Sequence, residues 1–139
     1  MLKRILVGFD GSENSRKAFA VALDFATRFK AALMVVTVTE LPEPTAVPTE
    51  IDELMQHAKA HYDLEFKRLR EAAESCGVEF SSHLAVGHPA EQIVNQADQQ
   101  NADMIVVGRR GLTKATRWLI GSVSERVLQY AHCPVTVVK

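Results

Sequence analysis

A strand–helix–strand unit occupies residues 5–38, which read ILVGFDGSENSRKAFAVALDFATRFKAALMVVTV. Residues 5–7 form a short apolar run that ends at Gly8, and residues 33–38 form a second run that is rich in β-branched side chains. Such runs are typical of strands buried on both faces. Between them, apolar residues recur at helical spacing from Ala18 to Phe29. A helix between two buried strands predicts a parallel pair joined by a crossover connection.

The rest of the chain repeats this alternation. The proline-rich residues 42–48 predict an extended surface loop, and a helix is expected from about Thr49, with Asp52 three residues on, to a stop at Gly77. Further strands are expected at 78–86, 104–107 and 135–138, and further helices at 89–99 and 122–131. We therefore predict one α/β domain, residues 1–139, with a doubly wound, five-stranded parallel sheet in the order 3-2-1-4-5 and helices on both faces, which makes three layers.

Composition excludes several classes of protein. The 139 residues carry 16 Lys and Arg against 17 Asp and Glu, a net charge of −1. A protein held on nucleic acid by phosphate contacts is normally basic, so we expect no nucleic-acid partner. No stretch approaches the roughly 20 apolar residues that cross a bilayer, and we expect no membrane attachment. The two cysteines, Cys76 and Cys133, form no CxxC pair. These features predict a cytoplasmic protein.

The loop at 108–122, which reads GRRGLTKATRWLIGS, has the character of an anion-binding segment. We expect Gly108 and Gly111 to allow positive φ and a close approach of the main chain to a ligand. Gly121-Ser122 opens the next predicted helix, so unpaired amides and the positive end of the helix dipole face the same crevice. A phosphate is the natural occupant of such a site. Four cations add to it: Arg109, Arg110, Lys114 and Arg117.

The two best-known nucleotide loops do not match this chain. It lacks the lysine of GxxxxGK[ST], and no GxGxxG follows the first strand, which disfavours phosphoryl transfer of the P-loop kind. Ser122 and Glu125 have the spacing of a capping box, so we also expect a structural role for Ser122 at the helix start.

The spacing Gly108-x2-Gly111-x9-Gly121-Ser122 resembles the G-x2-G-x9-G-[ST] signature of the ATP-binding universal stress proteins. Three further landmarks are similar to that family in the same order: residues 5–12, residues 87–93 and residues 133–138. The resemblance covers essentially the whole chain. It implies a domain that binds ATP, with or without Mg²⁺, because family members that do not bind ATP lack these glycines.

The resemblance also implies which residues bind the nucleotide. It places Asp10 beside the adenosine moiety and the main chain of Val38 against the adenine. Ribose and phosphates are then held by the glycine loop and the start of the following helix. These residues are Gly108, Arg109, Gly111, Gly121, Ser122, Val123 and Ser124. We assign no catalytic residue and no metal ligand, and expect at most slow ATP hydrolysis.

The last predicted strand, residues 135–138, lies at an edge of the sheet and carries little charge. An unprotected edge of this kind favours pairing with a second copy, and the resemblance implies a homodimer through this strand. The leading hypothesis is an ATP-dependent regulatory protein of the stress response with a protein partner. Two alternatives remain: a nucleotide-independent dimeric adaptor, and an enzyme like the adenine-nucleotide α-hydrolases, whose SGGxDS-like loop residues 10–15 match only loosely.

Overall fold

The computed structural model describes residues 1–40, 47–109 and 121–139. Its five strands form one sheet in the order β3-β2-β1-β4-β5, and every neighbouring pair is parallel. The predicted strand order is therefore confirmed. The elements are β1 (Arg4–Gly8), α1 (Glu13–Phe29), β2 (Ala32–Thr39), α2 (Pro48–Ser75), β3 (Phe80–Val86), α3 (Pro89–Gln99), β4 (Met104–Gly108), α4 (Ser122–Tyr130) and β5 (Val135–Val138).

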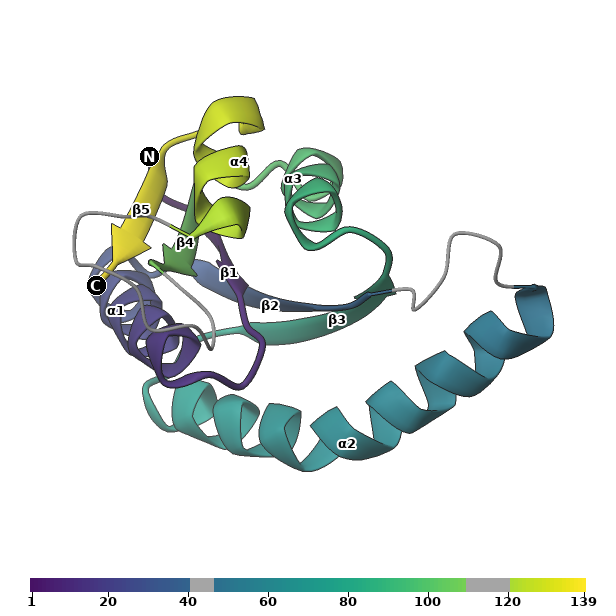
Figure 1. Ribbon diagram of the computed structural model, residues 1–139. Coiled ribbons are helices and arrows are strands. Elements are labelled where there is room, and N and C mark those ends of the chain that lie inside the picture. The colour runs from purple at the N-terminus through teal and green to yellow at the C-terminus, as the bar shows by residue number, and fades with distance from the viewer. Residues whose placement is uncertain (41–46, 110–120) are drawn as a thin grey trace.

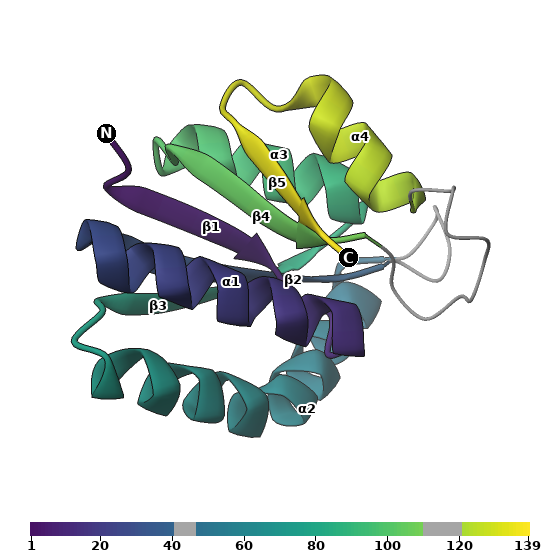
Figure 2. The ribbon, with the colours of Figure 1, turned by 90° about the vertical axis from the view of Figure 1, so that its left-hand side faces the viewer.

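Helices cover both faces of the sheet, as predicted. Helices α1 and α2 lie on one face, and α3 and α4 lie on the other (Figure 1 and Figure 2). Each face has its own apolar core. The core under α1 and α2 includes Val7, Phe19 and Leu69, and the core under α3 and α4 includes Ile93 and Val127. These buried side chains fix the sheet between two helical layers.

The start of α2 differs from the sequence expectation. Pro48 is the first helical residue and Val47 is its N-cap, so the helix begins just before Thr49. Proline suits this first position because its missing N–H would have no partner within the helix. The Val47 amide donates to Glu50 Oε2 at 3.3 Å, so Glu50 closes the first turn in place of the expected Asp52. Of the predicted loop at 42–48, residues 41–46 lie outside the described residues.

The end of α2 follows the prediction more closely. Gly77 takes φ +72 and stops the helix, since this left-handed conformation suits glycine. Strand β3 begins at Phe80, two residues later than expected, because the Val78 amide still bonds back to the Ala73 carbonyl. Within the described ranges, no helix is long and apolar enough to cross a bilayer.

Candidate functional site

A pocket lies where the winding of the sheet reverses. Strands β1 and β4 are adjacent, and the chain continues from them toward opposite edges of the sheet. Ligands of doubly wound folds bind beyond the carboxyl ends of the strands at this point. A cavity of about 740 Å³ opens there, within the range of about 300–1,000 Å³ that small-molecule pockets occupy.

The turn after β1 forms one wall of the pocket. The Phe9 amide donates to the Val36 carbonyl at 2.9 Å, and the buried Thr37 hydroxyl donates to the Phe9 carbonyl at 2.7 Å. Asp10 follows, exposed, and its Oδ1 accepts the Ser12 amide at 2.8 Å. Gly11 takes φ +84, which lets the chain reverse into α1. The turn therefore presents the Asp10 carboxylate at the mouth of the pocket.

The junction of β4 and α4 forms the opposite wall. The Gly121 amide donates to the Arg109 carbonyl at 2.8 Å, and the buried Ser124 hydroxyl donates to the Gly108 carbonyl at 2.5 Å. The first intrahelical bond of α4 runs from the Glu125 amide to Gly121. The amides of the first turn, residues 122–124, consequently have no partner within the helix. They line the pocket together with the positive end of the helix dipole.

Two local expectations at this junction are wrong. Gly121, not Ser122, is the N-cap of α4, and the Ser122–Glu125 capping box does not form because Ser122 already lies inside the helix. Gly108 does not adopt a positive φ. It is required for another reason: a Cβ atom on Gly108 would lie 2.8 Å from the main chain of Asn14. The main chain at Gly108 therefore lies close to helix α1.

Seven of the nine predicted site residues line this one pocket: Asp10, Val38, Gly108, Gly121, Ser122, Val123 and Ser124. Arg109 has a structural main-chain role, because its amide donates to the Val138 carbonyl at 2.7 Å and joins β4 to β5. Gly111 lies outside the described residues, as do the predicted cations Arg110, Lys114 and Arg117.

The pocket also contains residues that sequence reasoning missed. Glu40 follows the end of β2, and Pro89 and Ile93 reach the pocket from α3. Ile93 is 5% exposed and lines the pocket together with Val107. The position of Glu40, directly after a predicted strand, was a usable signal. The pocket role of Ile93 was concealed, because its helical spacing matches an ordinary core residue.

These walls fit the three parts of a nucleotide. Val38 and Ile93 provide an apolar surface for a base, and the carboxylates of Asp10 and Glu40 accept hydrogen bonds from amino or hydroxyl groups. The first turn of α4 favours a phosphate. Among the described residues, no group of three or more His, Cys, Asp or Glu side chains is placed to hold a metal ion.

Fold and pocket together define a doubly wound α/β protein with a pocket at the switch point of its sheet. Comparison with known proteins narrows this class. Residues 1–139 match the Universal stress protein family. A relative from Methanocaldococcus jannaschii, universal stress protein MJ0531, is 36% identical over 144 residues, which cover 100% of this chain and 83% of the relative. The chain belongs to the universal stress protein family.

Solved structures agree with this assignment. The structure of hypothetical protein MJ0577 has a TM-score of 0.85 and 29% identity, and the match covers 100% of this chain and 96% of that one. A universal stress protein in complex with cAMP has a TM-score of 0.75 and 26% identity, over 99% of this chain and 97% of that one. The Archaeoglobus fulgidus protein in complex with dAMP has a TM-score of 0.67 and 27% identity over 100% of both chains. Some structural neighbours thus bind adenine nucleotides.

Proposed function

We propose that this protein binds ATP, with or without Mg²⁺, in the pocket between β1 and β4 and uses it as a regulatory ligand. The observation that carries the proposal is the convergence of the Asp10 turn, the end of β2 at Val38 and the first-turn amides of α4 on one cavity. The cAMP and dAMP complexes of structural neighbours support an adenine nucleotide as the ligand class.

The proposal is for binding with at most slow hydrolysis. The α4 amides stabilise phosphate charge through fixed dipoles, and this requires no proton transfer. We assign Asp10 to the adenosine end and residues 121–124 to the ribose and phosphates, together with Gly108, Arg109 and Gly111 of the same loop. Nucleotide occupancy then changes the surface that a regulatory protein partner contacts in the cytoplasmic stress response.

Strand β5 supports the second part of the proposal, a homodimer. It lies at the edge of the sheet, and each of its residues, Val135–Val138, is half-buried rather than buried. Pairing with a second copy would satisfy the outward main-chain groups of this edge.

Calorimetric titration of the purified protein with ATP tests the proposal, together with identification of any nucleotide that co-purifies. The test variant is Gly121→Val. Gly121 has φ −66 and ψ 154, an extended conformation that valine adopts readily, so the new side chain adds bulk to the pocket without backbone strain. We expect at least tenfold weaker ATP binding.

The matched control is Ala131→Val. Ala131 caps the other end of α4 with nearly the same dihedrals, φ −66 and ψ 143, and is not among the described residues that line the pocket. This variant should bind ATP like the wild type. Failure of the wild type to bind ATP or ADP at millimolar concentration would overturn the proposal and favour the nucleotide-independent adaptor.

A further inference from the structure

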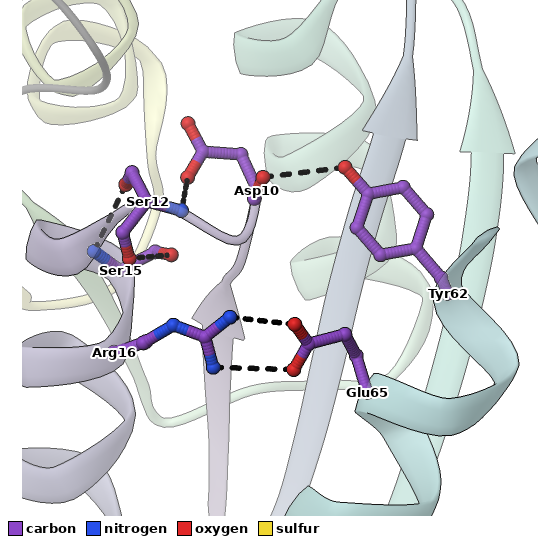
Figure 3. A network of polar contacts seen from close by, with 6 residues as sticks. All are labelled: Asp10, Ser12, Ser15, Arg16, Tyr62 and Glu65. Atoms are coloured by element: carbon purple, nitrogen blue, oxygen red, sulfur yellow. Dashed lines mark hydrogen bonds and ion pairs between the residues drawn. The ribbon is translucent and has the colours of Figure 1, made fainter.

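Helix α2 contacts the turn that carries Asp10 through two separate links. The Tyr62 hydroxyl donates to the main-chain carbonyl of Asp10 at 3.2 Å. One helical turn further on, Glu65 accepts two hydrogen bonds from the guanidinium of Arg16 on α1, at 2.6 and 3.1 Å. Figure 3 shows both links side by side, with Tyr62 and Glu65 reaching from α2 toward the start of α1. The first link joins residues 52 positions apart in the sequence, and the second joins residues 49 positions apart.

Tyr62 is held in place to make this contact. Its ring stacks on Phe66 with centroids 5.8 Å apart, and Phe66 packs against the core under α1 and α2. Burial raises the pKa of the Tyr62 phenol, and the negative charges of Asp10 and Glu65 raise it further. The hydroxyl therefore keeps its proton at physiological pH and remains a donor.

The second link, between Arg16 and Glu65, reaches the same turn through Phe9. The Arg16 guanidinium that binds Glu65 also lies over the ring of Phe9, 5.5 Å from its centroid. Phe9 is 2% exposed and immediately precedes Asp10. The bidentate contact has the fork geometry that orients both partners. Arg16 thus contacts both Glu65 of α2 and Phe9, the residue that precedes the turn, and so restrains α2 relative to Phe9.

The Asp10 turn is held by a hydrogen bond of its own and by one from α2. Gly11 takes φ +84, a conformation that glycine adopts at no steric cost, so the glycine itself adds little restraint to the peptide between Asp10 and Gly11. The Ser12 amide holds the Asp10 carboxylate, and the Tyr62 hydroxyl holds the Asp10 carbonyl. Together they fix both the direction of the side chain and that of the peptide.

From these contacts we infer that Tyr62 is a positioning residue of the nucleotide site, assisted by the Glu65–Arg16 pair, and that binding of adenosine at Asp10 is energetically coupled to the placement of α2. The inference rests on the proposed function. Since coupling is reciprocal, a ligand that orders the Asp10 turn must also order the middle of α2.

The test compares wild type with Tyr62→Phe, which keeps the ring and its stacking on Phe66 but removes the donor. Tyr130→Phe is the matched control, because Tyr130 is an exposed tyrosine at the end of α4. Adenosine and inorganic triphosphate are titrated separately. We expect Tyr62→Phe to bind adenosine about fivefold more weakly, the effect of one lost hydrogen bond, and to bind triphosphate unchanged.

Hydrogen exchange supplies a readout that a purely structural role would not move. Adenosine should slow amide exchange in residues 58–69 of α2 in the wild type and in Tyr130→Phe, but not in Tyr62→Phe. Glu65→Gln, which breaks the bidentate contact by a conservative change, should weaken adenosine binding in the same direction and replaces Tyr62→Phe if that variant does not fold.

The outcomes separate the two ideas. A wild type that binds neither ATP nor adenosine overturns the proposed function and the inference with it. A wild type that binds adenosine, with equal binding by Tyr62→Phe, overturns the inference alone. Equal loss of adenosine and triphosphate binding in Tyr62→Phe also overturns it, because that result indicates general loosening of the fold.

Discussion

Gly108, at the end of β4, packs directly against the main chain of Asn14 in the first turn of α1. A Cβ atom on Gly108 would lie 2.8 Å from both the carbonyl carbon and the carbonyl oxygen of Asn14, a separation that real Cβ atoms essentially never show. This contact limits how closely the start of α1 can lie against the end of β4. Gly108 also lines the pocket, so the contact lies beside it.

Gly108→Ala should destabilise the protein. The obstructing atoms belong to main chain, which cannot rotate away as a side chain does, so α1 or β4 must shift. We expect a loss of about 1–3 kcal/mol in the free energy of unfolding, the usual range for overpacking. Chemical denaturation measures it. Gly121→Ala is the control, since an N-cap change from glycine to alanine should cost less, about 1 kcal/mol or below; equal midpoints for wild type and Gly108→Ala would contradict the prediction.

Replacing two serines of α4 by alanine should have different effects, one on stability and the other on ATP binding. Ser124→Ala removes the bond from the buried Ser124 to the Gly108 carbonyl, so we expect a loss of about 1–2 kcal/mol in stability. Ser122 is exposed and makes no cap bond, so Ser122→Ala should change stability by less than about 0.5 kcal/mol. If Ser122 contacts phosphate as proposed, that variant should instead bind ATP about threefold to tenfold more weakly. Chemical denaturation and calorimetric titration of both variants distinguish the structural role of Ser124 from the binding role of Ser122. A loss of stability in Ser122→Ala together with unchanged stability in Ser124→Ala would refute both assignments.

The fold was predictable because its signals are local. Continuous apolar runs such as residues 33–38 and helical periodicity between them suffice to specify alternating strands and helices, and the crossover rule then limits the topology. The pocket followed from the same reasoning, since the strand ends at Gly8 and Gly108 are fixed once the order of the sheet is known.

What could not be predicted depends on distant pairs. Gly108 has no unusual φ of its own, and its constraint comes from Asn14, which is far away in the sequence. The Tyr62–Asp10 bond joins residues 52 apart, and in the sequence Tyr62 is one more apolar position on a helical stripe. The capping error at Ser122 has a different cause: α4 begins at Ser122, as predicted, but the N-cap is the residue that precedes the first helical one, which is Gly121.

Asp103 should make stability depend on acid pH. Its Oδ2 accepts the amides of Lys3 at 2.8 Å and Arg4 at 3.0 Å, which ties β1 to the segment before β4. The hydrogen bond from Lys3, chiefly, lowers the pKa of Asp103 in the folded protein, against a smaller opposing effect of desolvation. Because the folded pKa lies below the unfolded value of about 3.9, ionised Asp103 stabilises the fold above pH about 4, and this contribution disappears as the pH falls through the folded pKa.

Asp103→Asn should therefore be less stable than wild type at neutral pH, by about 1 kcal/mol or less at this half-exposed site. The difference should shrink as the pH falls below about 4 and vanish only below the folded pKa of Asp103. Thermal unfolding at a series of pH values gives the profile. Asp24→Asn is the control, because Asp24 is a surface carboxylate whose ion pair is with Arg28, one turn along the same helix α1. A difference between wild type and Asp103→Asn that is constant with pH would show that charge is not involved.

The main-chain directions along β5 determine which residue tests the proposed dimer. The carbonyl of Pro134 accepts the Ile105 amide, and the carbonyl of Val138 accepts the Arg109 amide, so both groups point toward β4. Main-chain groups alternate in direction along a strand. Thr136 therefore faces β4 as well, and the amide and carbonyl of Val137 point away from the sheet.

Val137→Pro should disrupt the dimer and leave the domain folded. Proline at this position removes an outward amide that a second copy would use, but it removes no bond to β4. Thr136→Pro is the contrasting variant, because it removes an inward amide and should lower the unfolding midpoint. Light scattering at micromolar concentration measures the mass, and circular dichroism confirms the fold. We expect a dimer for wild type, a folded monomer for Val137→Pro, and a destabilised protein for Thr136→Pro. A monomeric wild type, or a Val137→Pro variant that remains dimeric, would exclude pairing through β5, since the outward amide of Val137 lies at the centre of the edge that the pairing must use.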